Sequence, residues 1–294
     1  MAAQPYDAIV AGIEYSQSPP SSSEVVARQT SAEMAYIAAV APGPDGRVFA
    51  VMEGEPYRLI EIQAGNLREI ANFPRGWSPD VMVLDRAGNI YTMASGASND
   101  VALIAMSPDG NVRAIYSLLQ YLYTPGTPRA MDLAADQCTL YFAGTGLVIQ
   151  RFDVCKGTTL TPFATGGTNP IFDLRVLPDG GLLMSYPGGI ARYAANGAPD
   201  GTLHVTASPV AMALTHGGTR LMFAGEPCDP HNAQSCVGTP ESGVLSLYEL
   251  DLASENTTVV GPVYVDFPET LAPYFAWTAA LGDAHPSRRR ATRK

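Results

Sequence analysis

Hydrophobic and polar residues alternate along most of the chain, in short runs that are separated by turn residues. Clear examples are LDRAGNIYTM from Leu84, VLPDGGLLMS from Val176 and LTHGGTRLMF from Leu214. In each, a short apolar run meets a tight turn containing Gly or Asp, and a second apolar run follows. This pattern predicts a β-hairpin. LAADQCTLYF from Leu133 and the more distant GPDGRVFAVM from Gly43 show the same pattern.

A second hairpin is expected after each of these five. Its first strand alternates apolar and polar residues, and a turn and a further short strand complete the unit. The five segments begin at Tyr57, Ala102, Leu147, Gly189 and Val244. The sequence therefore predicts five units of four antiparallel strands with almost no helix.

The units are copies of one repeat. PDVMVL from Pro79, PRAMDL from Pro128 and PVAMAL from Pro209 place Pro, Met and Leu at matching offsets. A period of about 40 to 45 residues is the usual length of one four-stranded blade of a β-propeller. The recurring methionines are expected to form core between blades: Met82, Met131 and Met212.

The two ends of the chain hold further strand candidates. PYFAWTAAL from Pro273 is followed by too few residues for a complete blade, whereas YDAIVAGI from Tyr6 and EVVARQT from Glu24 are unassigned. Shared between the ends, these strands would form a sixth blade and leave no sheet edge exposed. The expected fold is therefore an all-β, six-bladed β-propeller, a single domain over residues 1–286 whose last blade is closed by N- and C-terminal strands.

Charge and hydropathy exclude several classes of function. The formal net charge is −10, although five basic residues lie within 288–294, so the rest of the chain is more acidic still. Residues 287–294 are expected to be a disordered basic tail. An acidic body repels phosphate backbones, which argues against nucleic-acid binding. No run of 18 apolar residues occurs, so no membrane-spanning segment is expected.

The four cysteines form two local pairs in the sequence. Cys138 opens one predicted strand and Cys155 closes the next, and a hairpin there pairs residues whose numbers sum to about 293. The two sulfurs should therefore face each other within disulfide reach. Cys228 and Cys236 would close a small loop, CDPHNAQSC. Two disulfides favour an extracellular or periplasmic location, although the first residues show no signal peptide.

The repeats also resemble a known group of proteins. PDG or AGN followed by a strand, without a Trp-Asp ending, is similar to the six-bladed propellers of the NHL-repeat, streptogramin lyase and gluconolactonase group. The likeness covers about residues 34 to 283. It implies the fold, whereas propellers carry enzymes and binding proteins alike.

Functional residues are expected on one face of such a propeller. The connections into each inner strand, and those between second and third strands, gather there around the channel. Arg75, Glu53, Glu55 and Asp100 belong to this face. Aromatic rings there either offer contact area to a sugar or peptide or pack between blades as core. The candidate ligand-binding residues are Trp77, Asp80, Tyr121, Tyr123, Arg129, Asp173 and His231.

A metal-dependent enzyme is the alternative that the resemblance implies. Gluconolactonase-like enzymes hold a divalent cation in the channel, where it polarises a lactone carbonyl and activates water. Among the matching positions, the set that would bind Ca²⁺ or Mg²⁺ is Glu33, Asp80, Asn169 and Asp173, whereas Val210 at a further matching position offers no ligand. Arg129 places a positive charge at the same level, so these side chains are otherwise expected to be satisfied by water and by pairing with Arg129.

The sequence thus favours a non-catalytic recognition propeller that binds a protein or glycan and needs no cofactor. The alternative is a metal-dependent lactonase, hydrolase or lyase. The resemblance to streptogramin lyases implies a histidine base, and only His231 lies on the expected face, on a loop near Asp229. Otherwise His231 is expected to be a solvent-exposed loop residue.

Overall fold

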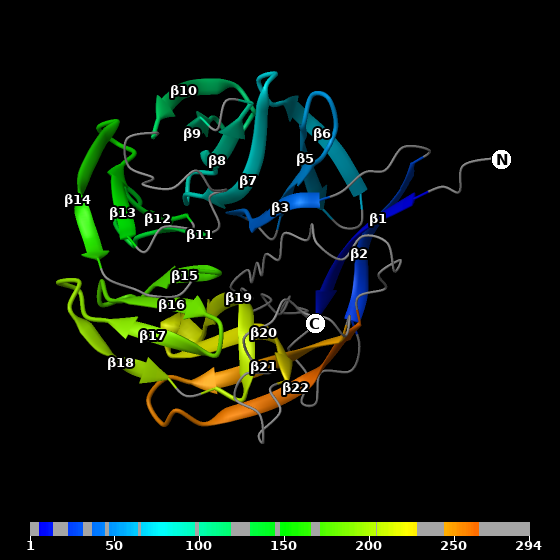
Figure 1. The fold of residues 1–294 in the computed structure, drawn as a ribbon. Helices are drawn as coiled ribbons and strands as arrows, with labels where there is room; N and C mark the ends of the chain where they lie inside the picture. The colour runs from blue at the N-terminus through cyan, green and yellow to red at the C-terminus, as the bar shows by residue number, and fades with distance from the viewer. Residues whose placement is uncertain are drawn as a thin grey trace, which may run out of the picture.

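The computed structural model describes residues 6–13, 23–31, 37–44, 47–63, 66–97, 100–118, 130–144, 148–165, 171–203, 205–227 and 244–264. Most of them lie in antiparallel β-strands. Five four-stranded sheets follow one another along the chain and stand around a common axis as the blades of a propeller (Figure 1). Within these ranges, no helix has the length and apolar character needed to cross a membrane.

Each blade consists of four consecutive strands that are hydrogen-bonded in chain order. The first blade contains β3 (Ile37–Pro42), β4 (Val48–Met52), β5 (Arg58–Gln63) and β6 (Asn66–Asn72). The second contains β7 (Trp77–Leu84), β8 (Ile90–Gly96), β9 (Val101–Met106) and β10 (Val112–Ser117). The third contains β11 (Ala130–Leu133), β12 (Thr139–Ala143), β13 (Val148–Asp153) and β14 (Thr158–Thr165). The fourth contains β15 (Asp173–Val176), β16 (Leu182–Tyr186), β17 (Gly189–Tyr193) and β18 (Pro199–Leu203). The fifth contains β19 (Ala207–Thr215), β20 (Arg220–Pro227), β21 (Val244–Asp251) and β22 (Thr257–Tyr264).

The inner hairpins have the turns that the sequence predicts. Between β7 and β8, the Asp85 carboxylate accepts backbone hydrogen bonds from Ala87 and Asn89 at 2.9 and 2.8 Å. Gly88 has a φ of 82°, which an L side chain rarely adopts. The Asp and Gly of this turn therefore fix where the first strand ends and the second begins.

The hydrophobic core lies between neighbouring blades. One buried cluster combines Phe49 and Leu59 of the first blade with Ile90 and Ile104 of the second. Similar clusters join the second to the third, the third to the fourth and the fourth to the fifth blade. The three repeated methionines are buried in these clusters, as predicted from their matching offsets: Met82, Met131 and Met212.

The number of blades corrects the sequence prediction. The described residues form five four-stranded blades rather than six. Strands β1 (Tyr6–Ile13) and β2 (Ser23–Ser31) do form where the terminal strands were expected, but they pair with each other in a two-stranded sheet. In Figure 1 this hairpin is drawn between the first and fifth blades. The strand expected from Pro273 lies outside the described residues. Within those residues, the terminal sheet has two strands.

The Cys138–Cys155 disulfide is confirmed. Its Cα atoms are 5.2 Å apart. The ladder pairs Thr139 with Asp153, so Cys138 stands opposite Val154, one residue short of the predicted register. The side chain of Cys155 still reaches Cys138 from the turn over residues 154–157, directly beyond the ladder. The pair Cys228 and Cys236 lies outside the described residues.

Candidate functional site

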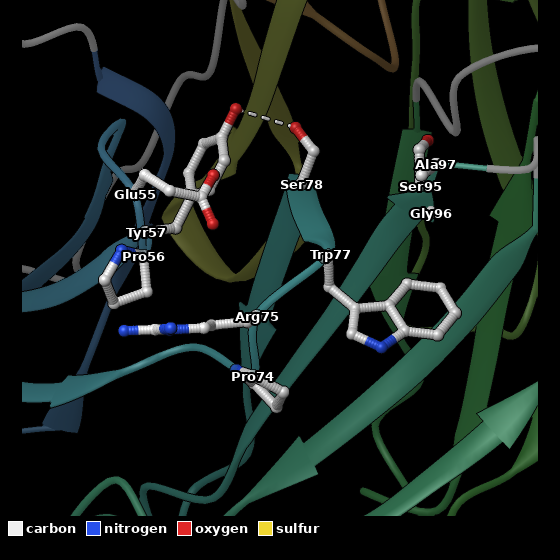
Figure 2. Close-up of a pocket in the computed structure, with 11 residues that line it drawn as sticks. Glu55, Pro56, Tyr57, Pro74, Arg75, Trp77, Ser78, Ser95, Gly96 and Ala97 are labelled. Carbon is white, nitrogen blue, oxygen red and sulfur yellow. Dashed lines mark hydrogen bonds between the residues drawn. The ribbon is translucent and has the colours of Figure 1, made fainter.

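A pocket of about 340 Å³ opens between the first and second blades. It is lined by the β4–β5, β6–β7 and β8–β9 connections and the strand ends beside them (Figure 2). These connections belong to the face on which functional residues were expected. The side chains that give the pocket its chemistry are Glu55, Tyr57, Arg75, Trp77, Ser78 and Ser95.

The connection from β6 to β7 brings an aromatic and a charged residue into the pocket. Phe73 is buried, and its backbone N–H donates to the Tyr57 carbonyl at 2.8 Å, which fixes the start of the connection. The chain then turns at Gly76, where φ is 81°, and β7 begins at Trp77. Arg75 and Trp77 therefore stand on either side of a turn, and both line the pocket.

The indole of Trp77 lies beside Gly96. A Cβ atom on Gly96 would lie 3.3 Å from Cζ3 of Trp77 and 3.2 Å from Cβ of Asp100. The Gly96 N–H also donates to the Asp100 carbonyl at 2.7 Å, which closes the β8–β9 connection. Trp77 is half-buried and packs against the first inter-blade core, so one ring serves as core and as pocket wall.

A hydrogen bond between blades closes one end of the pocket. The Ser78 hydroxyl donates to the Tyr57 hydroxyl at 2.8 Å (Figure 2). Burial raises the pKa of Tyr57 above its ordinary value of 10.0, and the carboxylates of Glu53, Asp80 and Glu55 raise it further. The Tyr57 phenol therefore lies in an acidic environment.

Asp80 lies behind the pocket wall. Its carboxylate accepts a hydrogen bond at 2.6 Å from the hydroxyl of Ser95, which lines the pocket. Burial raises the pKa of Asp80 to about 6, while bonds from the Ser95 side chain and backbone oppose the rise. Asp80 is therefore mostly ionised at pH 7 but gains a proton in mildly acidic solution.

Arg75 and Glu55 are the exposed charged side chains of the pocket. Within the described part of the chain, neither makes an ion pair with a neighbouring side chain. In Figure 2 the Arg75 side chain extends away from the hydroxyl pair of Tyr57 and Ser78, whereas Glu55 lies beside Tyr57. The pocket therefore has an acidic end and a basic end.

Asp173 lies in the innermost strand of the fourth blade, β15, and its carboxylate already accepts three hydrogen bonds from protein donors. One oxygen accepts from the Leu174 N–H at 2.8 Å and from the Arg175 guanidinium at 2.6 Å. The other accepts from the Met212 N–H at 2.7 Å. Burial raises the pKa of Asp173 to about 6, and Arg175 and the backbone bonds limit the rise. These bonds leave Asp173 poorly suited to hold a ligand.

The structure brings together only part of the predicted site. Trp77 lines the pocket and Asp80 lies behind its wall, whereas Asp173 is engaged within the strands around the axis. Among the residues described, no three His, Cys, Asp or Glu side chains form a group suited to a metal ion. The remaining predicted residues lie outside the described ranges: Glu33, Tyr121, Tyr123, Arg129, Asn169 and His231.

Sequence reasoning missed Tyr57, Ser78 and Ser95 as pocket residues. Tyr57 was assigned only to the start of a strand, and its hydroxyl partner belongs to the next blade. One local signal existed for Ser78, because Ser-Pro recurs at the start of two inner strands, as Ser78-Pro79 and Ser208-Pro209. No sequence pattern marked Ser95 as a pocket residue.

Comparison with known proteins supports the fold. No protein-family model and no curated protein matches the sequence. A gluconolactonase from Xanthomonas campestris has a similar structure, with a TM-score of 0.57 and 17% sequence identity over 70% of this chain and 73% of that one. A protein of unknown function from Bacteroides caccae has a TM-score of 0.59 and 13% identity over 82% and 85% of the two chains. The chain is thus similar in fold to gluconolactonase-like propellers.

Proposed function

We propose that the protein is a non-catalytic recognition propeller that binds a glycan in the pocket between its first two blades. The observation that carries the proposal is the combination of an indole wall, a hydroxyl pair and two charged side chains around one cavity, neither of which forms an ion pair with another described residue. A sugar ring has apolar faces that pack on aromatic rings, and its hydroxyls bond with carboxylate, guanidinium and hydroxyl groups.

The size of the pocket favours a glycan over a protein partner. Its volume of about 340 Å³ falls at the lower end of the range of small-molecule sites. A protein partner is bound by a broad surface with a buried aromatic or Arg anchor at its centre. The confirmed disulfide supports an extracytoplasmic location, where glycans are accessible.

A glycan array screened with the purified protein tests this proposal. The best ligand is then titrated calorimetrically against wild type, Trp77→Ala and Val259→Ala. Val259 is exposed on β22 of the fifth blade and serves as the control. Trp77→Ala should weaken binding about tenfold or more, because it removes the aromatic wall. Absence of protein binding to every glycan on the array, or equal binding by Trp77→Ala and wild type, would refute the proposal.

A metal-dependent lactonase is the second candidate. The structural similarity to a protein described as a gluconolactonase supports it. Of the four proposed ligands, Asp80 accepts a bond from Ser95 and Asp173 accepts three bonds from protein donors, so these two do not fit a shared ion as they stand. Hydrolysis of gluconolactone with added Ca²⁺ or Mg²⁺, abolished by EDTA and by Asp80→Asn, would favour the enzyme over the recognition protein.

A further inference from the structure

We propose that the pocket selects a glycan that carries a free amine, with the ammonium group at the Tyr57 end. This inference rests on the proposed glycan-binding function and specifies its ligand. The starting observation is the balance of charge: Glu53, Glu55 and Asp80 all act on the Tyr57 phenol, whereas Arg75 is the only basic side chain that lines the cavity among the described residues.

The position of the charges assigns the amine to one end. Glu55 lies beside Tyr57, and Asp80 reaches the wall through Ser95 at 2.6 Å. Arg75 extends away from the Tyr57 and Ser78 hydroxyls, so its positive charge does not neutralise that end (Figure 2). An ammonium beside Tyr57 would therefore meet a negative potential, and a carboxylate at the same place would be repelled.

The groups at this end also match the donors of an ammonium. An ammonium has three N–H donors and no acceptor, whereas ionised carboxylates are acceptors only. Aromatic faces attract cations as well, and the rings of Tyr57 and Trp77 both line the cavity. An N-acetyl group lacks the charge and two of the donors. The pocket should thus discriminate a free amine from its acetylated form.

The charge of the whole chain acts in the same direction. The formal net charge is −10. A negative protein attracts cationic ligands at long range and slows the approach of anionic ones. Uronic acids and sulfated sugars are therefore disfavoured before they reach Arg75.

A matched series of sugars tests the inference by isothermal titration calorimetry at pH 7. The probes are methyl glucosides with an amine at carbon 2, 3 or 6, their N-acetylated forms, methyl glucoside and methyl glucuronoside. We expect one of the amines to bind about tenfold more tightly than methyl glucoside, which corresponds to about 1.4 kcal/mol. Equal or tighter binding of the neutral or anionic probes overturns the inference but leaves glycan binding intact. If no probe binds and the glycan array is also blank, the proposed function itself fails.

Variants of Glu55 and Arg75 test the assignment independently, because these two side chains carry opposite charges. Glu55→Gln should weaken binding of the amine about fivefold more than it weakens binding of methyl glucoside, whereas Arg75→Gln should weaken the amine no more than methyl glucoside. Glu255→Gln and Arg86→Gln are the controls, because both residues are exposed in turns outside the pocket. Weaker amine binding in Arg75→Gln together with unchanged binding in Glu55→Gln would contradict the assignment.

Discussion

The carboxylate of Asp173 accepts a hydrogen bond at 2.7 Å from the backbone N–H of Met212, which lies 39 residues further along the chain in the next blade. Asp132 repeats this arrangement one blade earlier, because it accepts from the Val176 N–H at 2.7 Å. Two aspartates thus connect the innermost strands of the third, fourth and fifth blades. These side-chain hydrogen bonds connect neighbouring blades, as backbone hydrogen bonds connect the strands within one blade.

Removing this connection should destabilise the ring. Asp173→Ala leaves the Met212 N–H without its acceptor and the Arg175 guanidinium without its ion pair. We expect a loss of about 3 kcal/mol in the free energy of unfolding, measured with urea. Asp109→Ala, in an exposed turn, is the control. A loss of less than about 0.5 kcal/mol, the usual size of a surface effect, would show that the connection is dispensable.

The same aspartates predict how stability changes with pH. The pKa of Asp173 is raised from 3.8 to about 6 by burial, against the opposing effect of Arg175, and burial also raises the pKa of Asp132. The folded state therefore holds these protons more tightly than the unfolded state does. Stability should rise as the pH falls from about 7 to about 5.

Other carboxylates limit how far this rise in stability extends toward low pH. Arg68 and Arg47 hold the pKa of Glu61 below its ordinary value despite its burial, so the stability that it contributes is lost at lower pH. Urea midpoints between pH 4 and pH 8 should therefore pass through a maximum on the acidic side. In Asp173→Asn the rise from pH 7 to pH 5 should shrink, and an unchanged rise would mean that other groups cause it.

The Cys138–Cys155 disulfide should stabilise the third blade. It joins residues 17 apart, and closing a loop of that length is worth about 3 kcal/mol. The variant with both residues changed to serine should lose about that amount in urea unfolding. Mass spectrometry of the same variant under non-reducing conditions then reports on the predicted pair Cys228 and Cys236. Two free thiols in that variant would contradict the second disulfide.

The sequence predicted the blades well because their signals are local. The turn at Asp85 to Gly88 and the alternation of the strands around it lie within one short segment. The described residues form five blades rather than the six predicted, because the sixth depends on strands from both ends of the chain coming together, and of these only β1 and β2 are described. The links made by Asp132 and Asp173 were missed for a similar reason. Each carboxylate finds its partner in the next blade, and no residue pattern in one repeat shows this.

The candidate site was predictable only in part. Arg75 and Trp77 were expected near each other because they stand at the entry to an inner strand, a position that follows from the repeat alone, and both line the pocket. The hydrogen bond between Tyr57 and Ser78 was not predictable, because it depends on how two blades pack together. The chemistry of the pocket thus arises between repeats, whereas the sequence pattern reports on each repeat separately.

Gly96 provides a test of the pocket wall that leaves the polar groups unchanged. A methyl group at this position would press on the Trp77 indole at 3.3 Å and on Asp100. Gly96→Ala should therefore tilt the indole and weaken glycan binding about fivefold, with a small effect on stability. Ala253→Ser, in an exposed turn outside the pocket, is the control. Full affinity in Gly96→Ala would mean that the position of the indole is not critical.

Asp80 should make binding of an amine-bearing sugar dependent on pH. Its carboxylate is faced by the Ser95 hydroxyl, and Tyr57 with Glu53 and Glu55 lies nearby. Because burial raises the pKa of Asp80 to about 6, a fall from pH 7 to pH 5 removes its negative charge, whereas an alkyl ammonium stays protonated throughout. The dissociation constant of the 6-amino glucoside should thus rise about fivefold over this range, while methyl glucoside shows no change. Asp80→Asn should bind the amine weakly at both pH values and flatten the profile. A profile that keeps its slope in Asp80→Asn would contradict this role of Asp80.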